Sequence, residues 1–127
     1  MSDAYVDTSM LVAMLFGEPG SDAVTRRVEC YSRIVSSNLL EAELRSVCRR
    51  DARKLTPGLL SELQWIEPDR PLSAEIERVL SAGYVRGADC WHLAAALFVA
   101  PEPGELTFLT LDKRQRDVAT TLGFRTE

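Results

Sequence analysis

The sequence predicts an α/β protein of three layers, in which helices cover both faces of a short, mostly parallel central sheet. Strand-like and helix-like segments alternate along the 127 residues, as in chains whose parallel strands are joined by right-handed helical crossovers. The segment "CWHLAAALFVA" is apolar on all sides, which is typical of a helix buried in the middle of a domain. No internal repeat or long linker interrupts this pattern, so residues 1–127 are expected to form a single domain.

The first thirty residues predict one strand and two helices. "AYVDT" (4–8) begins with the strand formers Tyr5 and Val6. "SMLVAMLF" (9–16) and "SDAVTRRVEC" (21–30) predict a helical pair, which is broken by the Gly- and Pro-containing segment between them.

The middle of the chain predicts two strands and two helices. "RIVSS" (33–37) is a short strand, and "NLLEAELRSVCRRDARK" (38–54) has the periodicity of a helix. "PGLLSEL" (57–63) predicts a short helix that leads into the strand-like "QWIE" (64–67).

The last part of the chain predicts three helices and one strand. "SAEIERVLSAGY" (73–84) is a helix ending near Gly83, and "ADCWHLAAALFVA" (88–100) is the buried helix. "LTFLTLD" (106–112) is the last clear strand, and the helix "KRQRDVATTLG" (113–123) precedes a short tail.

Composition excludes several classes of protein. The net charge of −4 argues against holding nucleic acid by bulk electrostatics. No segment reaches the length of a membrane span or resembles a signal peptide. Cys30, Cys48 and Cys90 are widely spaced without a CxxC, which favours reduced core thiols in a cytoplasm. His92 is the single histidine, so a histidine-rich metal site is excluded.

Two aspartates stand where predicted strands end. Asp7 ends the first strand, and Asp112 ends the strand 106–112. Ligands of an open parallel sheet bind in the crevice beyond the carboxyl ends of its strands, so both carboxylates are expected at that edge. The alternative for each is a helix N-cap, a position where aspartate is favoured.

Glu43 is expected to point partly toward the core. The apolar face of the helix 38–54 consists of Leu40, Leu44 and Val47. At the helical period Glu43 lies toward this face, whereas Glu41 projects away from it, one turn from Arg45. Burying an unpaired carboxylate costs several kcal/mol or forces it to take up a proton. Glu43 therefore needs a partner, either a cation or an arginine such as Arg50.

Asp89 precedes the most apolar part of the chain and by itself is a good helix N-cap. A central buried helix would bring Asp89 to the same end of the sheet as the other acids. His92 follows one turn later and is expected to be a packed, hydrogen-bonded core residue, with a general base as the alternative. Asp117 is expected to be exposed near Lys113, with a peripheral role at the site as the alternative.

The candidate site thus consists of four acids, Asp7, Glu43, Asp89 and Asp112. Converging carboxylates repel one another and raise each other's pKa values. Divalent cations remove this problem, and a ligand set of oxygens alone suits Mg²⁺ or Mn²⁺. Two such ions about 4 Å apart are a common device for cleaving phosphodiesters, one helping to activate water and the other stabilising the leaving oxygen.

The same acids stand in segments that resemble the motifs of PIN-domain nucleases. "YVDTSMLV" resembles the opening motif with Asp7, and "SSNLLEAELRSVCRR" resembles the second with Glu43. "RGADCWHLAAAL" is similar to the third, with Asp89 as the acid and His92 as a frequent companion. "FLTLDKRQRDVATTLGF" is similar to the fourth, with Asp112. The motifs occur in order and cover nearly the whole chain.

Short, stand-alone PIN domains of this kind resemble VapC-type toxins of prokaryotic toxin–antitoxin pairs. The resemblance implies a Mg²⁺- or Mn²⁺-dependent endoribonuclease that acts on RNA, commonly tRNA or rRNA. It also implies a homodimer and a small cognate antitoxin that inserts into or covers the active site. Basic residues at the rim are expected to contact RNA phosphates or an acidic segment of the antitoxin; they are Arg45, Arg49, Arg50, Lys113, Arg114 and Arg116.

Three other functions are weighed against this one. A phosphoryl-transfer fold that phosphorylates Asp7 is the first alternative. Haloacid dehalogenases need a second aspartate two residues after the first, and Ser9 stands there in this chain. Receiver domains need an acidic pair before the phosphorylated residue, which is not evident here. A non-catalytic PIN-like binding module would carry an unused, destabilising acid cluster. A serine hydrolase using Ser9 and His92 lacks a nucleophile elbow.

Overall fold

The structure, a computed structural model, describes residues 2–17 and 19–127. Its strands are β1 (Asp3–Val6), β2 (Arg33–Ser37), β3 (Leu63–Ile66) and β4 (Leu106–Leu109). Its helices are α1 (Thr8–Phe16), α2 (Ser21–Glu29), α3 (Leu39–Arg50), α4 (Ser73–Ala82), α5 (Gly87–Val99) and α6 (Lys113–Leu122), with a short 3-10 turn η1 (Pro103–Glu105).

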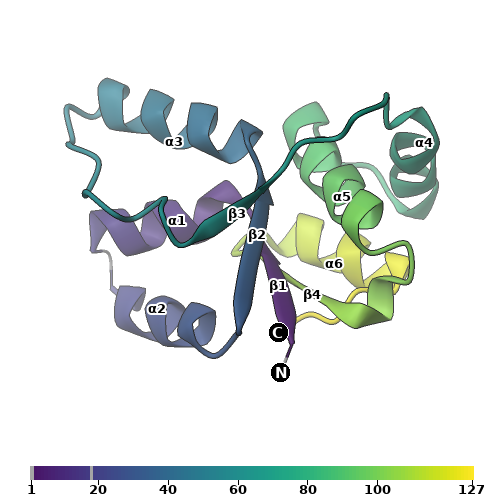
Figure 1. Ribbon diagram of the computed structural model, residues 1–127, viewed down its shortest axis with the longest axis horizontal. Helices are drawn as coiled ribbons and strands as arrows, with labels where there is room; N and C mark the ends of the chain where they lie inside the picture. Colours follow the sequence, from purple (N-terminus) through teal and green to yellow (C-terminus); the bar gives the residue numbers. More distant parts are fainter. Residues whose placement is uncertain (1, 18) are drawn as a thin grey trace.

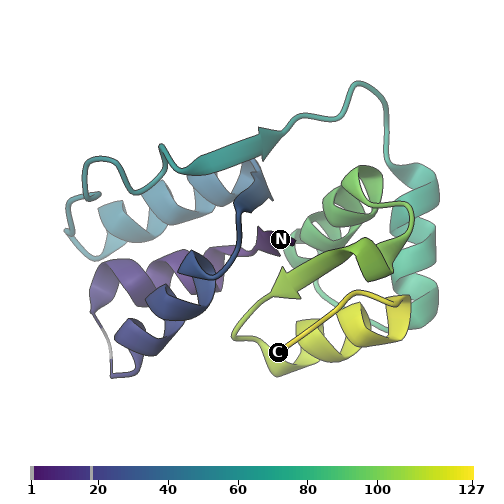
Figure 2. The same cartoon turned by 60° about the horizontal axis from the view of Figure 1, so that its bottom comes forward.

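The four strands form one sheet in the order β3-β2-β1-β4, and every pairing in it is parallel. Helices α1 to α3 cover one face and helices α4 to α6 cover the other (Figures 1 and 2). The predicted three-layer α/β/α fold with a short parallel sheet is therefore confirmed.

Side chains of β1 alternate between two hydrophobic cores, as the pleat of a strand requires. Ala4 and Val6 pack with α1 and α3 through residues such as Met10 and Leu44. Tyr5 packs on the opposite face, in the core that includes most of α5. Because β1 is central and both faces are covered, the positions directly after it are held firmly.

Helix α5 is buried in the centre of one layer, as its apolar sequence predicts. Its buried residues are Cys90, His92, Leu93, Ala94, Ala95, Ala96 and Leu97. Within the described residues, no helix has both the length and the apolar character needed to cross a membrane. All three cysteines are free, and Cys48 and Cys90 are buried, but Cys30 is exposed and so lies outside the core in which it was expected.

The predicted helix 38–54 is too long. Helix α3 ends at Arg50, because Ala52 takes a left-handed conformation with φ of 51°. The N–H of Arg53 then donates to the carbonyl of Cys48 at 2.8 Å, which closes the helix end.

The predicted short helix 57–63 is wrong. Residues 57–62 form successive turns, with hydrogen bonds such as that from the N–H of Ser61 to the carbonyl of Gly58 at 3.2 Å. Gly58 has φ of 85°, which interrupts a right-handed helix. Three leucines in and after this segment suggested helical spacing. They pack instead against the core between α1 and the sheet, and they are Leu59, Leu60 and Leu63.

Candidate active site

The order of the strands determines where a site can form. From β1 the chain moves outward to β2 and β3, and it then returns to β4 on the other side of β1. Ligands of open parallel sheets bind beyond the carboxyl ends of the strands at such a reversal. Asp7 lies at this point, and its N–H donates to the carbonyl of Leu109 at the end of β4, at 3.2 Å.

A cavity of about 400 Å³ opens at this edge of the sheet. It is lined by Asp7, Thr8, Ser9, Val12, Ala13, Glu43, Asp89, His92, Leu111 and Asp112. The cavity thus brings together all four acids that the sequence singled out, although they come from four separate segments of the chain.

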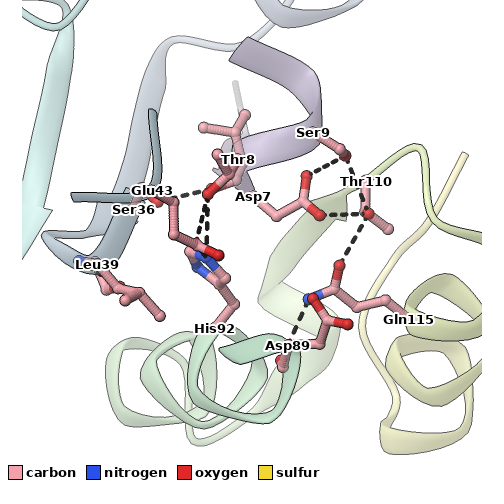
Figure 3. Close-up of polar contacts among 12 residues, drawn as sticks. Asp7, Thr8, Ser9, Ser36, Leu39, Glu43, Asp89, His92, Thr110 and Gln115 are labelled. Atoms are coloured by element: carbon pink, nitrogen blue, oxygen red, sulfur yellow. Dashed lines mark hydrogen bonds and ion pairs between the residues drawn. The ribbon is translucent and has the colours of Figure 1, made fainter. Parts of the chain in front are cut away.

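Asp7 is buried at 4% exposure and is held by two hydroxyl groups. Ser9 Oγ donates to Asp7 Oδ1 at 2.6 Å, and Thr110 Oγ1 lies 2.6 Å from Asp7 Oδ2 (Figure 3). Asp7 stands at the N-cap position of α1, but its side chain makes no capping hydrogen bond. Burial raises the pKa of Asp7, and the bonds from Ser9 and Thr110 offset that rise only in part.

Thr110 links Asp7 to Gln115. Thr110 Oγ1 also lies 2.9 Å from Oε1 of Gln115, whose amide nitrogen is turned toward the carbonyl of Asp89 at 3.2 Å. A hydroxyl has only one hydrogen. The single hydrogen of Thr110 can therefore serve only one of these contacts at a time, and the contact with Asp7 is the shorter of the two.

Glu43 lines the cavity, and its partners within the described residues are a hydroxyl and an imidazole rather than an arginine. Thr8 Oγ1 donates to Glu43 Oε1 at 2.7 Å, and His92 Nε2 lies 2.8 Å from the same oxygen. Arg50, the arginine considered for this role, pairs with Asp51 instead. Burial by itself would raise the pKa of Glu43, but the hydrogen bonds from His92 and Thr8 together bring it below the usual value.

His92 is a packed core residue at 1% exposure, as expected, yet its ring also reaches the cavity. Its Nδ1 lies 2.6 Å from the hydroxyl of Tyr5, and its Nε2 faces Glu43. A general-base role is not supported by this geometry, because both ring nitrogens already have partners inside the protein.

Asp89 is not the N-cap of α5; that position belongs to Arg86, and Asp89 is the third residue of the helix. Its side chain is half-buried in the cavity wall. Burial raises the pKa of Asp89, and the negative charges of Asp112 and Glu43 raise it further. An anion at this place benefits from the N-terminal end of a helix, but it is crowded by other anions.

Asp112 caps α6, since its Oδ1 accepts a hydrogen bond from the N–H of Gln115 at 2.9 Å. The cap alternative is therefore correct for Asp112, which nevertheless lines the cavity as well. Asp117 is exposed and pairs with Lys113 at 2.9 Å, as expected, and it lies outside the residues that line the cavity.

Four residues around these acids were not identified from the sequence: Tyr5, Thr8, Thr110 and Gln115. Thr8 and Thr110 looked like ordinary neighbours of Asp7 and Asp112. Gln115 is fully buried, and it stands at helical spacing from the buried residues Val118, Ala119 and Leu122. A polar residue on the apolar face of α6 was the signal that could have revealed it.

The donor set fits a hard divalent cation by its chemistry. Four carboxylates line one cavity, and across residues 2–17 and 19–127 none of them forms an ion pair with lysine or arginine. Oxygen ligands of this kind suit Mg²⁺ or Mn²⁺. In the part of the chain that the structure describes, no three His, Cys, Asp or Glu side chains lie close enough together to hold a metal ion as they stand. Hydroxyl groups hold the oxygens of Asp7, Thr8 and His92 hold one oxygen of Glu43, and the N–H of Gln115 donates to Asp112.

The fold and this cavity define a class of three-layer α/β proteins with an acid cluster at the carboxyl edge of a parallel sheet. The family model for the PIN domain matches residues 4–120, and the chain belongs to that family. The chain is also 33% identical over 126 residues to a protein named Ribonuclease VapC46 from Mycobacterium tuberculosis (strain ATCC 25618 / H37Rv). That similarity covers 97% of this chain and 95% of the relative. No solved structure matches the chain.

Proposed function

We propose that the protein is a metal-dependent endoribonuclease that cleaves RNA phosphodiesters and serves as the toxin of a toxin–antitoxin pair. The observation that carries this proposal is the convergence of four acids on one cavity without a lysine or arginine counter-charge among the described residues. Membership of the PIN family and the similarity to a VapC ribonuclease support the same activity.

In this proposal Asp7, Glu43, Asp89 and Asp112 hold Mg²⁺ or Mn²⁺. The cation, when bound, supplies charge that activates water and stabilises the leaving oxygen. The protein supplies orientation: Ser9 and Thr110 fix both oxygens of Asp7, while Thr8 and His92 fix one oxygen of Glu43. Such outer contacts determine how tightly and in which geometry carboxylates bind a metal.

The partners that we propose follow the family: tRNA or rRNA as substrate, a small antitoxin that covers the cavity, and a second copy of the chain in a cytoplasmic homodimer. Among the basic residues expected at the rim, Arg45, Arg50 and Lys113 are engaged in ion pairs with Glu41, Asp51 and Asp117. These exposed pairs are weak enough to exchange for phosphate or for an acidic segment.

Cleavage of an RNA panel tests the proposal. Purified protein is incubated with total tRNA and with ribosomal RNA in Mg²⁺, in Mn²⁺, and in excess chelator, and the products are mapped at their ends. We expect discrete internal cuts with either cation, loss of cutting in chelator, and recovery when the cation is restored. Intact RNA in every condition would favour the non-catalytic binding module instead.

A further inference from the structure

We propose that His92 is a positioning residue that holds Glu43 through an Nε2–H hydrogen bond, and that the buried hydroxyl of Tyr5 selects this tautomer. The consequence for cation binding rests on the proposed function, but the tautomer itself does not. Neither residue is expected to touch substrate; both act through Glu43.

A continuous chain of hydrogen bonds leads from the sheet to the cavity. The N–H of Ser37, at the end of β2, lies 3.2 Å from the hydroxyl of Tyr5. That hydroxyl lies 2.6 Å from Nδ1 of His92, and Nε2 of His92 lies 2.8 Å from Oε1 of Glu43. Figure 3 shows the last part of this chain, where the imidazole ring lies against the carboxylate of Glu43. The contacts join β1, β2, α5 and α3.

The geometry of these contacts favours one placement of protons. A phenol carries its proton at neutral pH, since the ordinary tyrosine pKa is about 10. The N–H of Ser37 can only donate, which leaves the phenol hydrogen for Nδ1 of His92. A neutral imidazole that accepts at Nδ1 carries its hydrogen on Nε2, and Nε2 faces the carboxylate of Glu43. The reverse tautomer would point a lone pair at that carboxylate.

Packing holds Tyr5 rigidly enough to make this selection. Tyr5 has 0% exposure, and its ring stacks on Phe108 with a centroid separation of 5.1 Å and an interplanar angle of 7°. The His92 ring meets Tyr5 nearly edge-on, at 5.7 Å and 75°. A ring packed in this way keeps its hydroxyl oxygen beside the imidazole.

The same arrangement leaves one oxygen of Glu43 for a ligand. Thr8 and His92 both bind Oε1, whereas Oε2 has no hydrogen-bond partner within residues 2–17 and 19–127. Glu43 lines the cavity. Fixing one oxygen with two donors therefore presents the other to the cavity in a defined orientation, the usual task of contacts around a metal ligand.

The tautomer can be measured directly, because His92 is the single histidine of the chain. Nitrogen NMR of protein labelled with ¹⁵N-histidine, at about pH 8 and without added cation, reports this ring alone; the ordinary imidazole pKa is about 6.5. We expect Nδ1 to give the shift of an unprotonated nitrogen and Nε2 that of a protonated one. Reversed shifts, averaged shifts, or two protonated nitrogens would overturn the proposal, whether or not the protein cleaves RNA.

Variants test the consequence for Glu43 through Mn²⁺ affinity measured by calorimetry. Tyr5→Phe should shift the His92 tautomers toward a mixture and weaken Mn²⁺ binding by about 10- to 100-fold. The exposed Tyr84, at 67% exposure, provides the control Tyr84→Phe, which should change neither quantity. If Tyr5→Phe fails to fold, the spectrum of the unmodified protein still decides the tautomer.

A second pair of variants separates positioning from packing. His92→Gln keeps an amide N–H that can reach Glu43, whereas His92→Leu keeps volume but no donor. We expect Mn²⁺ affinity in His92→Gln to stay within a few-fold of the unmodified protein, and that in His92→Leu to fall about 10- to 100-fold. Equal affinities in the two variants would show that His92 only fills space.

Discussion

The substitution Asp7→Asn is expected to reduce RNA cleavage at least about a thousandfold while leaving the free energy of unfolding unchanged or higher. The loss follows from removing a charged ligand worth several kcal/mol of transition-state stabilisation, at about 1.4 kcal/mol for each factor of ten. The stability follows from burial: at 4% exposure the neutral amide is easier to accommodate than the carboxylate.

The effect of Asp7→Asn on stability should depend on pH in a defined direction. Because the pKa of Asp7 is raised in the folded protein, ionising it disfavours folding as pH rises above the ordinary carboxyl range of about 4. The gain in unfolding free energy from Asp7→Asn should therefore be small at pH 4 and larger at pH 7. Urea denaturation in excess chelator at the two pH values measures this difference in unfolding free energy. In the cleavage assay, normal turnover by Asp7→Asn would remove Asp7 from the mechanism.

The substitution Asp89→Asn is expected to have the second largest effect, a loss of cleavage of at least about a hundredfold. Asp89 is half-buried, and its pKa is raised by burial and by the charge of Asp112. Removing its charge should relieve that repulsion, so the metal-free variant should unfold at higher urea than the unmodified protein near neutral pH. Mn²⁺ affinity should fall in parallel with activity.

Asp117→Asn is the matched control for Asp89→Asn. Asp117 is exposed and pairs with Lys113 on the surface of α6, a contact worth roughly 0.3–0.5 kcal/mol. Cleavage and Mn²⁺ affinity in this variant should stay within about twofold of the unmodified protein, as for other exposed pairs. A large loss of activity in Asp117→Asn, or full activity in Asp89→Asn, would mean that the wrong acid has been assigned to the cavity.

The layered fold could be predicted from the sequence because the patterns that indicate it lie within single helices and strands. Alternation of segments, the apolar face of α3 and the all-round apolar character of α5 each depend on neighbours within one element. The positions of Asp7 and Asp112 also follow locally, since both come soon after a strand. The prediction of a helix over 57–63 was wrong because it relied on local spacing alone. The leucines of this segment have helical spacing, but Gly58 takes a left-handed conformation that the periodicity does not reveal.

The contacts that organise the site could not be predicted, because they join distant parts of the chain. Glu43 and His92 are 49 residues apart, and Tyr5 and His92 are 87 apart. Their meeting depends on how α3 and α5 approach from opposite faces of the sheet (Figure 1). An arginine was a reasonable partner for Glu43 from helical spacing alone, but only the tertiary arrangement shows that an imidazole and a hydroxyl take that place.

The central claim is that the four acids bind one or two divalent cations in the cavity. Crystals grown with Mn²⁺ and measured for its anomalous scattering test this claim most directly, since the signal locates the metal without reference to activity. We expect an anomalous peak within about 2.0–2.6 Å of oxygens of both Asp7 and Asp89, the range of hard-cation bonds. Saturating Mn²⁺ with no peak in the cavity, or a peak bound only by surface acids such as Asp117, would contradict it.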